Sequence, residues 1–162
     1  MKGFGQKNNS KKRSKKQTKP FTEAMVNQAI KLHLQGNISE AAKCYQNLIN
    51  QGLNDHIVFS NYGVILRDLG NLKKAELFTC KAIKINPEYA YAHFNLGNIL
   101  NDLGNLEEAE LSTRKAIELK PNFADAHYNL GNILTNLGKF KDAEVCLYKA
   151  IELKPSFADA YL

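Results

Sequence analysis

Residues 92–100 read Ala-His-Phe-Asn-Leu-Gly-Asn-Ile-Leu, and residues 126–134 read Ala-His-Tyr-Asn-Leu-Gly-Asn-Ile-Leu. The second stretch lies 34 residues after the first. The full windows 90–123 and 124–157 share 21 of 34 residues. A fixed period of this length indicates an array of repeats, each of which is one structural unit that needs its neighbours to bury its apolar face.

Each repeat predicts two helices joined by a tight turn. In window 90–123, apolar residues recur at helical spacing, Gly104 interrupts the pattern, and a second apolar stripe ends before Pro121. Proline disfavours helix at the residue that precedes it, and glycine tolerates the positive φ that such a turn requires. We expect small residues of the two helices to face each other and allow close approach: Gly63, Gly97 and Gly131 on the first helices, and Ala75, Ala109 and Ala143 on the second.

The pattern His93-x-x-Leu96-Gly97-x-x-Leu100, followed by Ala109 and Pro121, resembles the tetratricopeptide repeat (TPR) signature. Windows 56–89 and 124–157 carry the signature in phase, whereas window 22–55 is degenerate and resembles a capping repeat. The resemblance implies an all-α solenoid of four helix-turn-helix repeats over residues 22–162. The predicted repeats are 22–55, 56–89, 90–123 and 124–157, with the start of a fifth at 158–162.

The N-terminal segment differs from the rest of the chain in composition. Residues 1–20 contain eight lysines and arginines and no acid, whereas the remaining residues contain 14 bases and 16 acids. Residues 1–21 are therefore predicted to be a disordered basic tail, because such a segment buries too little apolar surface to offset its ordering entropy. The tail is either a solubilising arm or a contact for nucleic acid or an anionic surface.

Composition and motifs argue against several classes of protein. No stretch has the ~20 consecutive apolar residues of a membrane span, and no catalytic, phosphate-binding or metal-binding motif occurs. Cys44, Cys80 and Cys146 lack the spacing of a zinc site or a disulfide framework, so we expect reduced thiols that fill small spaces in the core. These features predict a cytoplasmic protein that is not an enzyme and needs no metal or cofactor.

The candidate binding residues recur in the first helix of each repeat. One column is asparagine in all four windows, a second pair of asparagines lies one turn further along, and two aromatic residues adjoin them. The predicted peptide-binding residues are Asn27, Asn61, Asn95, Asn129, Asn98, Asn132, Phe94 and Tyr128. In the TPR family this helix lines a concave groove, and side-chain amides offer donors and acceptors to an extended peptide backbone. The alternative is that the asparagines bond only locally, between helices.

Two histidines, His93 and His127, share a column with Phe59 and Met25, and we interpret them as structural residues. The groove columns contain no cation that would hold a C-terminal carboxylate. The asparagine ladder is similar to the TPR arm of protein O-GlcNAc transferases, although the chain has nothing that resembles their catalytic domain.

We therefore predict a TPR scaffold for protein binding, a non-catalytic module that holds an extended peptide segment in its concave groove. The alternative is the N-terminal substrate-recognition part of a larger glycosyl- or sulfotransferase. A third hypothesis makes the basic tail the main binding element. Residues 158–162 begin a repeat without completing it. We therefore expect either that the chain is a piece of a longer protein or that the apolar face of the fourth repeat associates with another molecule, including a second copy.

Overall fold

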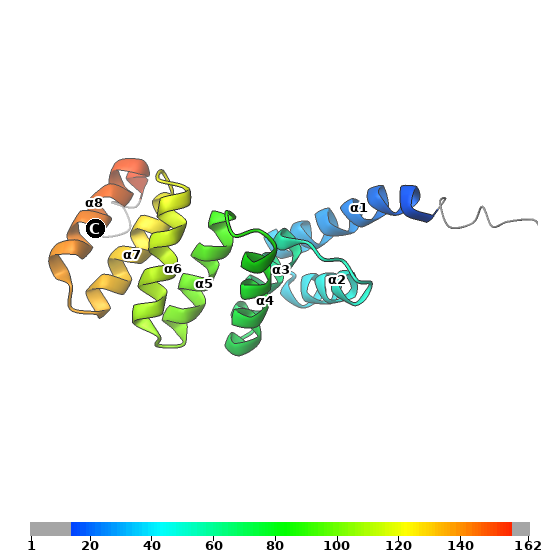
Figure 1. The fold of residues 1–162 in the computed structure, drawn as a ribbon, viewed down its shortest axis with the longest axis horizontal. Coiled ribbons are helices and arrows are strands. Elements are labelled where there is room, and N and C mark those ends of the chain that lie inside the picture. Colours follow the sequence, from blue (N-terminus) through cyan, green and yellow to red (C-terminus); the bar gives the residue numbers. More distant parts are fainter. Residues whose placement is uncertain (1–13, 157–162) are drawn as a thin grey trace, which may run out of the picture. The chain divides into compact units, whose positions relative to one another are not determined.

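The computed structural model describes the backbone of residues 14–156 and the side chains of residues 22–156. Within that range the chain is all-α, as predicted, and contains eight helices (Figure 1). They are α1 (Ser14–Leu34), α2 (Ile38–Asn50), α3 (His56–Asp68), α4 (Leu72–Ile85), α5 (Ala90–Asp102), α6 (Leu106–Leu119), α7 (Ala124–Asn136) and α8 (Phe140–Leu153). The chain divides into two compact units, Met1–Leu53 and Asn54–Leu162.

The first unit contains the hairpin of α1 and α2, with Ala41, Tyr45 and Leu48 buried on α2. Helix α1 begins at Ser14, so the prediction of a disordered tail as far as residue 21 is wrong over residues 14–21. Residues 14–19 contain lysines and a glutamine, which are good helix formers, although Pro20 lacks the N–H that would continue the helical hydrogen bonds at that point. Residues 1–13 lie outside the described residues.

The second unit contains three hairpins, α3/α4, α5/α6 and α7/α8, which follow one another in a row (Figure 1). Their first helices begin at His56, Ala90 and Ala124, which is the 34-residue period of the sequence. The incomplete fifth repeat, residues 158–162, lies outside the described residues, so association through this end of the array stays a prediction.

Glycine closes each inter-helix turn as predicted. The φ angles of Gly70, Gly104 and Gly138 are 75°, 80° and 72°. After α5, the Gly104 N–H donates to the Asn101 carbonyl at 3.0 Å and the next N–H donates to the Leu100 carbonyl at 2.9 Å. This pair of bonds satisfies carbonyls at the end of the helix and requires the left-handed conformation at the glycine.

The two helices of each hairpin approach closely at a glycine of the first helix. A Cβ placed on Gly97 would lie 3.3 Å from the Ala109 carbonyl oxygen and closer still to Thr113 Oγ1. A Cβ on Gly131 would lie 3.3 Å from the Ala143 carbonyl oxygen and 2.6 Å from Leu147 Cγ. These distances confirm that glycine faces alanine across the hairpin. A side chain at the glycine would require the second helix or its side chains to shift.

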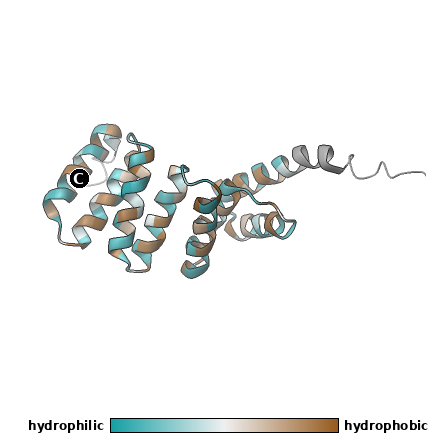
Figure 2. Cartoon of the chain, viewed as in Figure 1, coloured by the Kyte–Doolittle hydropathy of each residue, from teal (hydrophilic) through white to brown (hydrophobic). Residues whose placement is uncertain are grey.

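The apolar core continues from one hairpin of the second unit into the next. Leu100 of α5, Ala109 of α6 and Ile133 of α7 form one buried cluster. Figure 2 shows hydrophobic and hydrophilic residues interleaved along each of these helices, as expected when one face of a helix is buried. In the part of the chain that is described, no helix combines the length and the apolar character that crossing a membrane requires.

Candidate functional site

The first helices of the three hairpins in the second unit form one continuous layer. The backbone of α3 lies against that of α5, and α5 lies against α7, whereas the backbones of α4, α6 and α8 do not approach one another as closely. Partly exposed side chains of α3, α5 and α7 therefore lie on neighbouring surfaces. Seven of the eight predicted peptide-binding residues come from these helices, and the eighth, Asn27, is exposed on α1 in the other unit.

Side chains link α3 to α5 sideways. The Asn95 amide nitrogen donates to Ser60 Oγ at 3.0 Å, and Ser60 is fully buried. Near the other end of the same helices, Arg67 Nε donates to the carboxylate of Asp102. In both pairs the residue on the second helix lies 35 positions after its partner. The amide of Asn95 therefore helps to hold two repeats together. This is the alternative raised in the sequence analysis, local bonding between helices.

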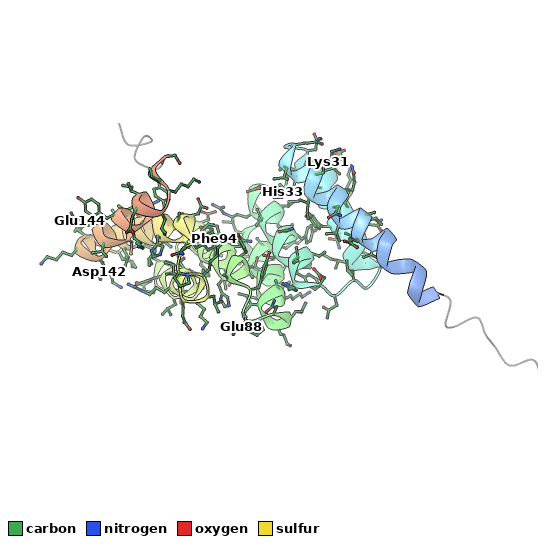
Figure 3. All side chains as sticks on the ribbon, turned by 90° about the horizontal axis from the view of Figure 1, so that it is seen from above. Lys31, His33, Glu88, Phe94, Asp142 and Glu144 are labelled. Carbon is green, nitrogen blue, oxygen red and sulfur yellow. The ribbon has the colours of Figure 1, made fainter. Side chains whose placement is uncertain are left out.

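The equivalent pair between α5 and α7 is different. Phe94 stands at the position of Ser60 and Asn129 at the position of Asn95, and a phenyl ring cannot accept a conventional hydrogen bond from the amide. Phe94, labelled in Figure 3, instead packs against Phe123 with ring centroids 4.7 Å apart and joins a core cluster with Ala116 and Ala126. Asn129 is partly exposed and has no hydrogen-bond partner among the described residues.

Three asparagine amides on α5 and α7 are partly exposed and unpaired in the part of the chain that the structure describes. Like Asn129, Asn98 and Asn132 are partly exposed and have no hydrogen-bond partner within residues 22–156. We call this group the amide surface: Asn98, Asn129 and Asn132. Asn61 and Tyr128 are also partly exposed, and each interacts with another group of the protein.

The two aligned histidines have a structural role, as interpreted from the sequence. His93 Nε2 donates to the Pro87 carbonyl at 2.8 Å, and His127 Nε2 donates to the Pro121 carbonyl at 2.9 Å. Because a carbonyl can only accept, Nε2 carries a proton in both rings. Each histidine ties the start of a first helix to the connection that precedes it. The sequence indicated a bulky packing residue here and did not reveal the hydrogen bond.

The cysteines are free, but the expectation that all three fill the core is wrong for Cys80, which is exposed. Cys146 packs against the cluster of Leu130, Leu134 and Ala143. Partial desolvation raises the pKa of the Cys80 and Cys146 thiols above the ordinary value, and the nearby Glu76 carboxylate adds to the shift at Cys80. Among the residues that the structure describes, no three His, Cys, Asp or Glu side chains gather in a way that could hold a metal ion.

A cavity of about 580 Å³ in the second unit was not predicted. Its lining residues come from α3, α4 and the connection before α3: Asn54, Phe59, Lys81, Lys84 and Ile85. The signal was present in the sequence, because the position of Lys84 is occupied by glutamate, Glu118 or Glu152, in the next two repeats. The recurring residues do not reveal this cavity, because it depends on positions that differ from one repeat to the next.

Comparison with protein families gives four consecutive, overlapping matches. Models described as "Tetratricopeptide repeat" match residues 58–89, 81–110 and 124–157, and a model described as "TPR repeat" matches residues 97–138. The chain belongs to the tetratricopeptide repeat family. The matched region runs without a gap from residue 58 to residue 157 and so spans all three hairpins of the second unit.

Solved TPR proteins share the fold. The crystal structure of MamA aligns with a TM-score of 0.74 at 20% identity, over 85% of this chain and 81% of that one. A MamA fragment from Desulfovibrio magneticus RS-1 has a TM-score of 0.74 at 22% identity and covers 83% and 76% of the two chains. YrrB, described as a TPR protein with an unusual peptide-binding site, has a TM-score of 0.71 at 25% identity, over 83% of this chain and 69% of that one.

No curated protein matches the chain significantly by sequence. The similarity to the TPR arm of O-GlcNAc transferases therefore remains a resemblance of the repeat pattern.

Proposed function

We propose that this TPR chain is a non-catalytic protein-interaction module that binds an extended peptide segment across α5 and α7. The observation that carries the proposal is the amide surface: three partly exposed amides on adjacent helices, without partners in the described part of the chain. Each amide offers two donor hydrogens and one acceptor oxygen, which match the N–H and C=O groups of any extended backbone.

YrrB supports peptide binding by a fold of this kind, since it is described as having a peptide-binding site and its structure aligns with 83% of this chain. Phe94 and Tyr128 lie beside the amides in sequence and are partly exposed, so they offer apolar contact to side chains of the bound segment. Recognition through the backbone would give affinity with little dependence on charge, because Asn98, Asn129 and Asn132 carry none.

A peptide selected from a random phage-displayed library for binding to the full chain provides the probe. Replacing Asn98, Asn129 and Asn132 by alanine should weaken binding of that synthetic peptide by about tenfold or more, because several hydrogen bonds are lost together. Asn122→Ala is the matched control, since Asn122 is exposed in the connection between α6 and α7, outside the amide surface. Equal affinity of the triple variant and the wild type in calorimetry would refute peptide binding at this surface.

A further inference from the structure

The unpredicted cavity combines positive charge with an apolar wall. Lys81 and Lys84 lie three residues apart on α4. Ile85 supplies exposed aliphatic surface, and Phe59, which is 7% exposed, contributes the edge of a mostly buried ring. Lys81 Nζ lies 4.7 Å from the ring centroid of Phe78 and 5.9 Å from that of Phe59. Neither lysine has a carboxylate partner among the described residues. We call this cavity the basic pocket: Asn54, Phe59, Lys81, Lys84 and Ile85.

The corresponding positions in the next two hairpins carry paired charges. Lys115, aligned with Lys81, donates to Glu118 at 2.7 Å, and Lys149 donates to Glu152 at 2.9 Å. The acid lies three residues after the lysine in both hairpins, and in α4 that position is Lys84. Lys84 in place of glutamate leaves Lys81 without a carboxylate partner and adds a second positive charge. The lysine charge that a glutamate neutralises in each of the next two hairpins is therefore uncompensated in α4.

The aromatic side of the pocket also differs. Phe59 is aligned with His93 and His127, each of which donates a hydrogen bond to a proline carbonyl. A phenyl ring cannot make that bond, and Phe59 instead stacks on Phe78 with ring centroids 5.9 Å apart. The polar contact of the other two hairpins is thus replaced by an aromatic contact beside the ammonium group of Lys81.

We propose that the basic pocket binds an acidic segment of a partner protein. A carboxylate of the segment lies between the ammonium groups of Lys81 and Lys84, and an adjoining apolar side chain packs against Ile85 and the exposed edge of Phe59. Two unpaired cations favour an anion, and the hydrogen bonds that they form to a carboxylate are charge-assisted. The apolar wall favours a peptide over a small hydrated ion, which would leave that wall in contact with water. The basic pocket shares no residue with the amide surface, so this site is independent of the proposed function.

The test titrates the ¹⁵N-labelled full chain with a blocked pentapeptide, acetyl-Asp-Glu-Phe-Glu-Asp-amide, in NMR. We expect chemical shift changes at the backbone amides of Asn54, Phe59 and Lys81. Lys84→Glu recreates the lysine–glutamate pair of the next hairpins and should weaken binding by about tenfold or more. The same peptide with Asn and Gln in place of its acids should not bind.

The matched control is Lys74→Glu, which makes the same change of charge on the same helix at an exposed residue outside the pocket. It should change the affinity by less than about twofold, because an isolated surface charge acts mainly through screened long-range attraction. Equal weakening by Lys74→Glu and Lys84→Glu would overturn the proposal, since binding would then follow overall charge. Lys84→Gln provides a second variant if the charge reversal disturbs folding, as judged by circular dichroism.

Two further probes separate the peptide from other anions. One probe is inorganic phosphate, and the other is vesicles of phosphatidylcholine with phosphatidylserine. Neither should cause Lys84-dependent chemical shift changes at the pocket residues. If either of them does so while the acidic pentapeptide causes none, the pocket is an anion or membrane contact and the proposal is wrong.

Discussion

The hairpins α3/α4 and α5/α6 have helices of the same lengths in the same register, yet they differ in the chemistry that they present. Both place glycine opposite threonine at the point of closest approach, Gly63 with Thr79 and Gly97 with Thr113. Ser60, however, is replaced in α5 by a phenylalanine. The comparison shows that a few small residues determine how the helices pack, while the positions between them are free to differ from one repeat to the next.

The shared glycine position should have the largest effect on stability. Alanine at position 97 would place its Cβ in contact with Thr113 Oγ1 and 3.3 Å from the Ala109 carbonyl oxygen. We expect Gly97→Ala to lower the free energy of unfolding by about 2 kcal/mol, because overpacking forces the helices apart. Urea denaturation followed by circular dichroism measures the change.

The sign of this effect is itself informative. In a helix that was not crowded, the same substitution would raise stability by about 1 kcal/mol, since alanine is the better helix former. A more stable Gly97→Ala variant would thus rule out the close approach. The double variant with Thr113→Ala should recover part of the loss relative to Thr113→Ala alone, because removing the hydroxyl makes room for the new methyl group.

The helices were predictable from sequence because their determinants are local and recur. Gly104 and Pro121 predicted where a helix ends in each repeat, and the structure has α5 and α6 ending at the preceding Asp102 and Leu119. The start of α1 was not predictable from the charge pattern, which indicated disorder over residues that extend the helix to Ser14. Net charge describes the interaction of a segment with solvent, whereas helix extension depends on its neighbour in the chain.

The sideways contacts between first helices give the next largest expected effect. Ser60→Ala should lower stability by about 1 kcal/mol, because the Asn95 amide loses the acceptor that it has at 3.0 Å in a partly buried position. In the next pair of helices, Asn129→Ala should change stability by less than about 0.5 kcal/mol, since Asn129 has no partner in the described part of the chain. Thermal unfolding of both variants tests the difference.

If the two variants were equally destabilised, Asn129 would have a structural role like that of Asn95, and the amide surface would lose one of its three members. If neither were destabilised, the bond between Ser60 and Asn95 would contribute little to holding α3 beside α5.

The candidate site could be predicted from the sequence only in part, for a physical reason. The asparagine column was visible as a repeat, but whether an amide is available depends on the residue 35 positions earlier on the neighbouring helix. That residue is Ser60 for Asn95 and Phe94 for Asn129. The pairing across helices is set by tertiary packing, and the sequence pattern along one helix does not reveal it.

A glutamate column shows the same contrast between hairpins. Glu110 of α6 accepts hydrogen bonds from Lys139, just before α8, at 2.6 Å and from Arg114 of its own helix. Among the residues that the structure describes, Glu76, in the aligned position of α4, pairs only with Lys73 of its own helix. The position aligned with Lys139 is Asn105. Of Glu110 and Glu76, therefore, Glu110 is the one that is bridged to the following hairpin.

The smallest effect is expected from this bridge, and it depends on pH. The hydrogen bond from Lys139 is the main cause that holds the pKa of the Glu110 carboxyl below its ordinary value, and Arg114 adds to it. Because the pKa of this carboxyl is lower in the folded chain than in the unfolded chain, the charged carboxylate stabilises the fold at neutral pH. This stabilisation is lost as the pH falls below the pKa of the unfolded chain and through the pKa of the folded chain. Glu110→Gln should thus cost about 1 kcal/mol at pH 7 and progressively less in acid, because the wild type itself loses the charge there.

Glu76→Gln is the matched variant, and its effect on the free energy of unfolding should be smaller and should depend less on pH, because the carboxylate does not join two hairpins. Denaturation curves at several pH values compare the two variants with the wild type. A parallel pH dependence for both glutamates would mean that the link to Lys139 adds nothing beyond an ordinary surface charge. Asn105→Lys tests the comparison in the opposite direction, because it gives Glu76 a lysine at the same sequence distance as Lys139 from Glu110. In the Asn105→Lys background, Glu76→Gln should lower the free energy of unfolding more at neutral pH than in acid.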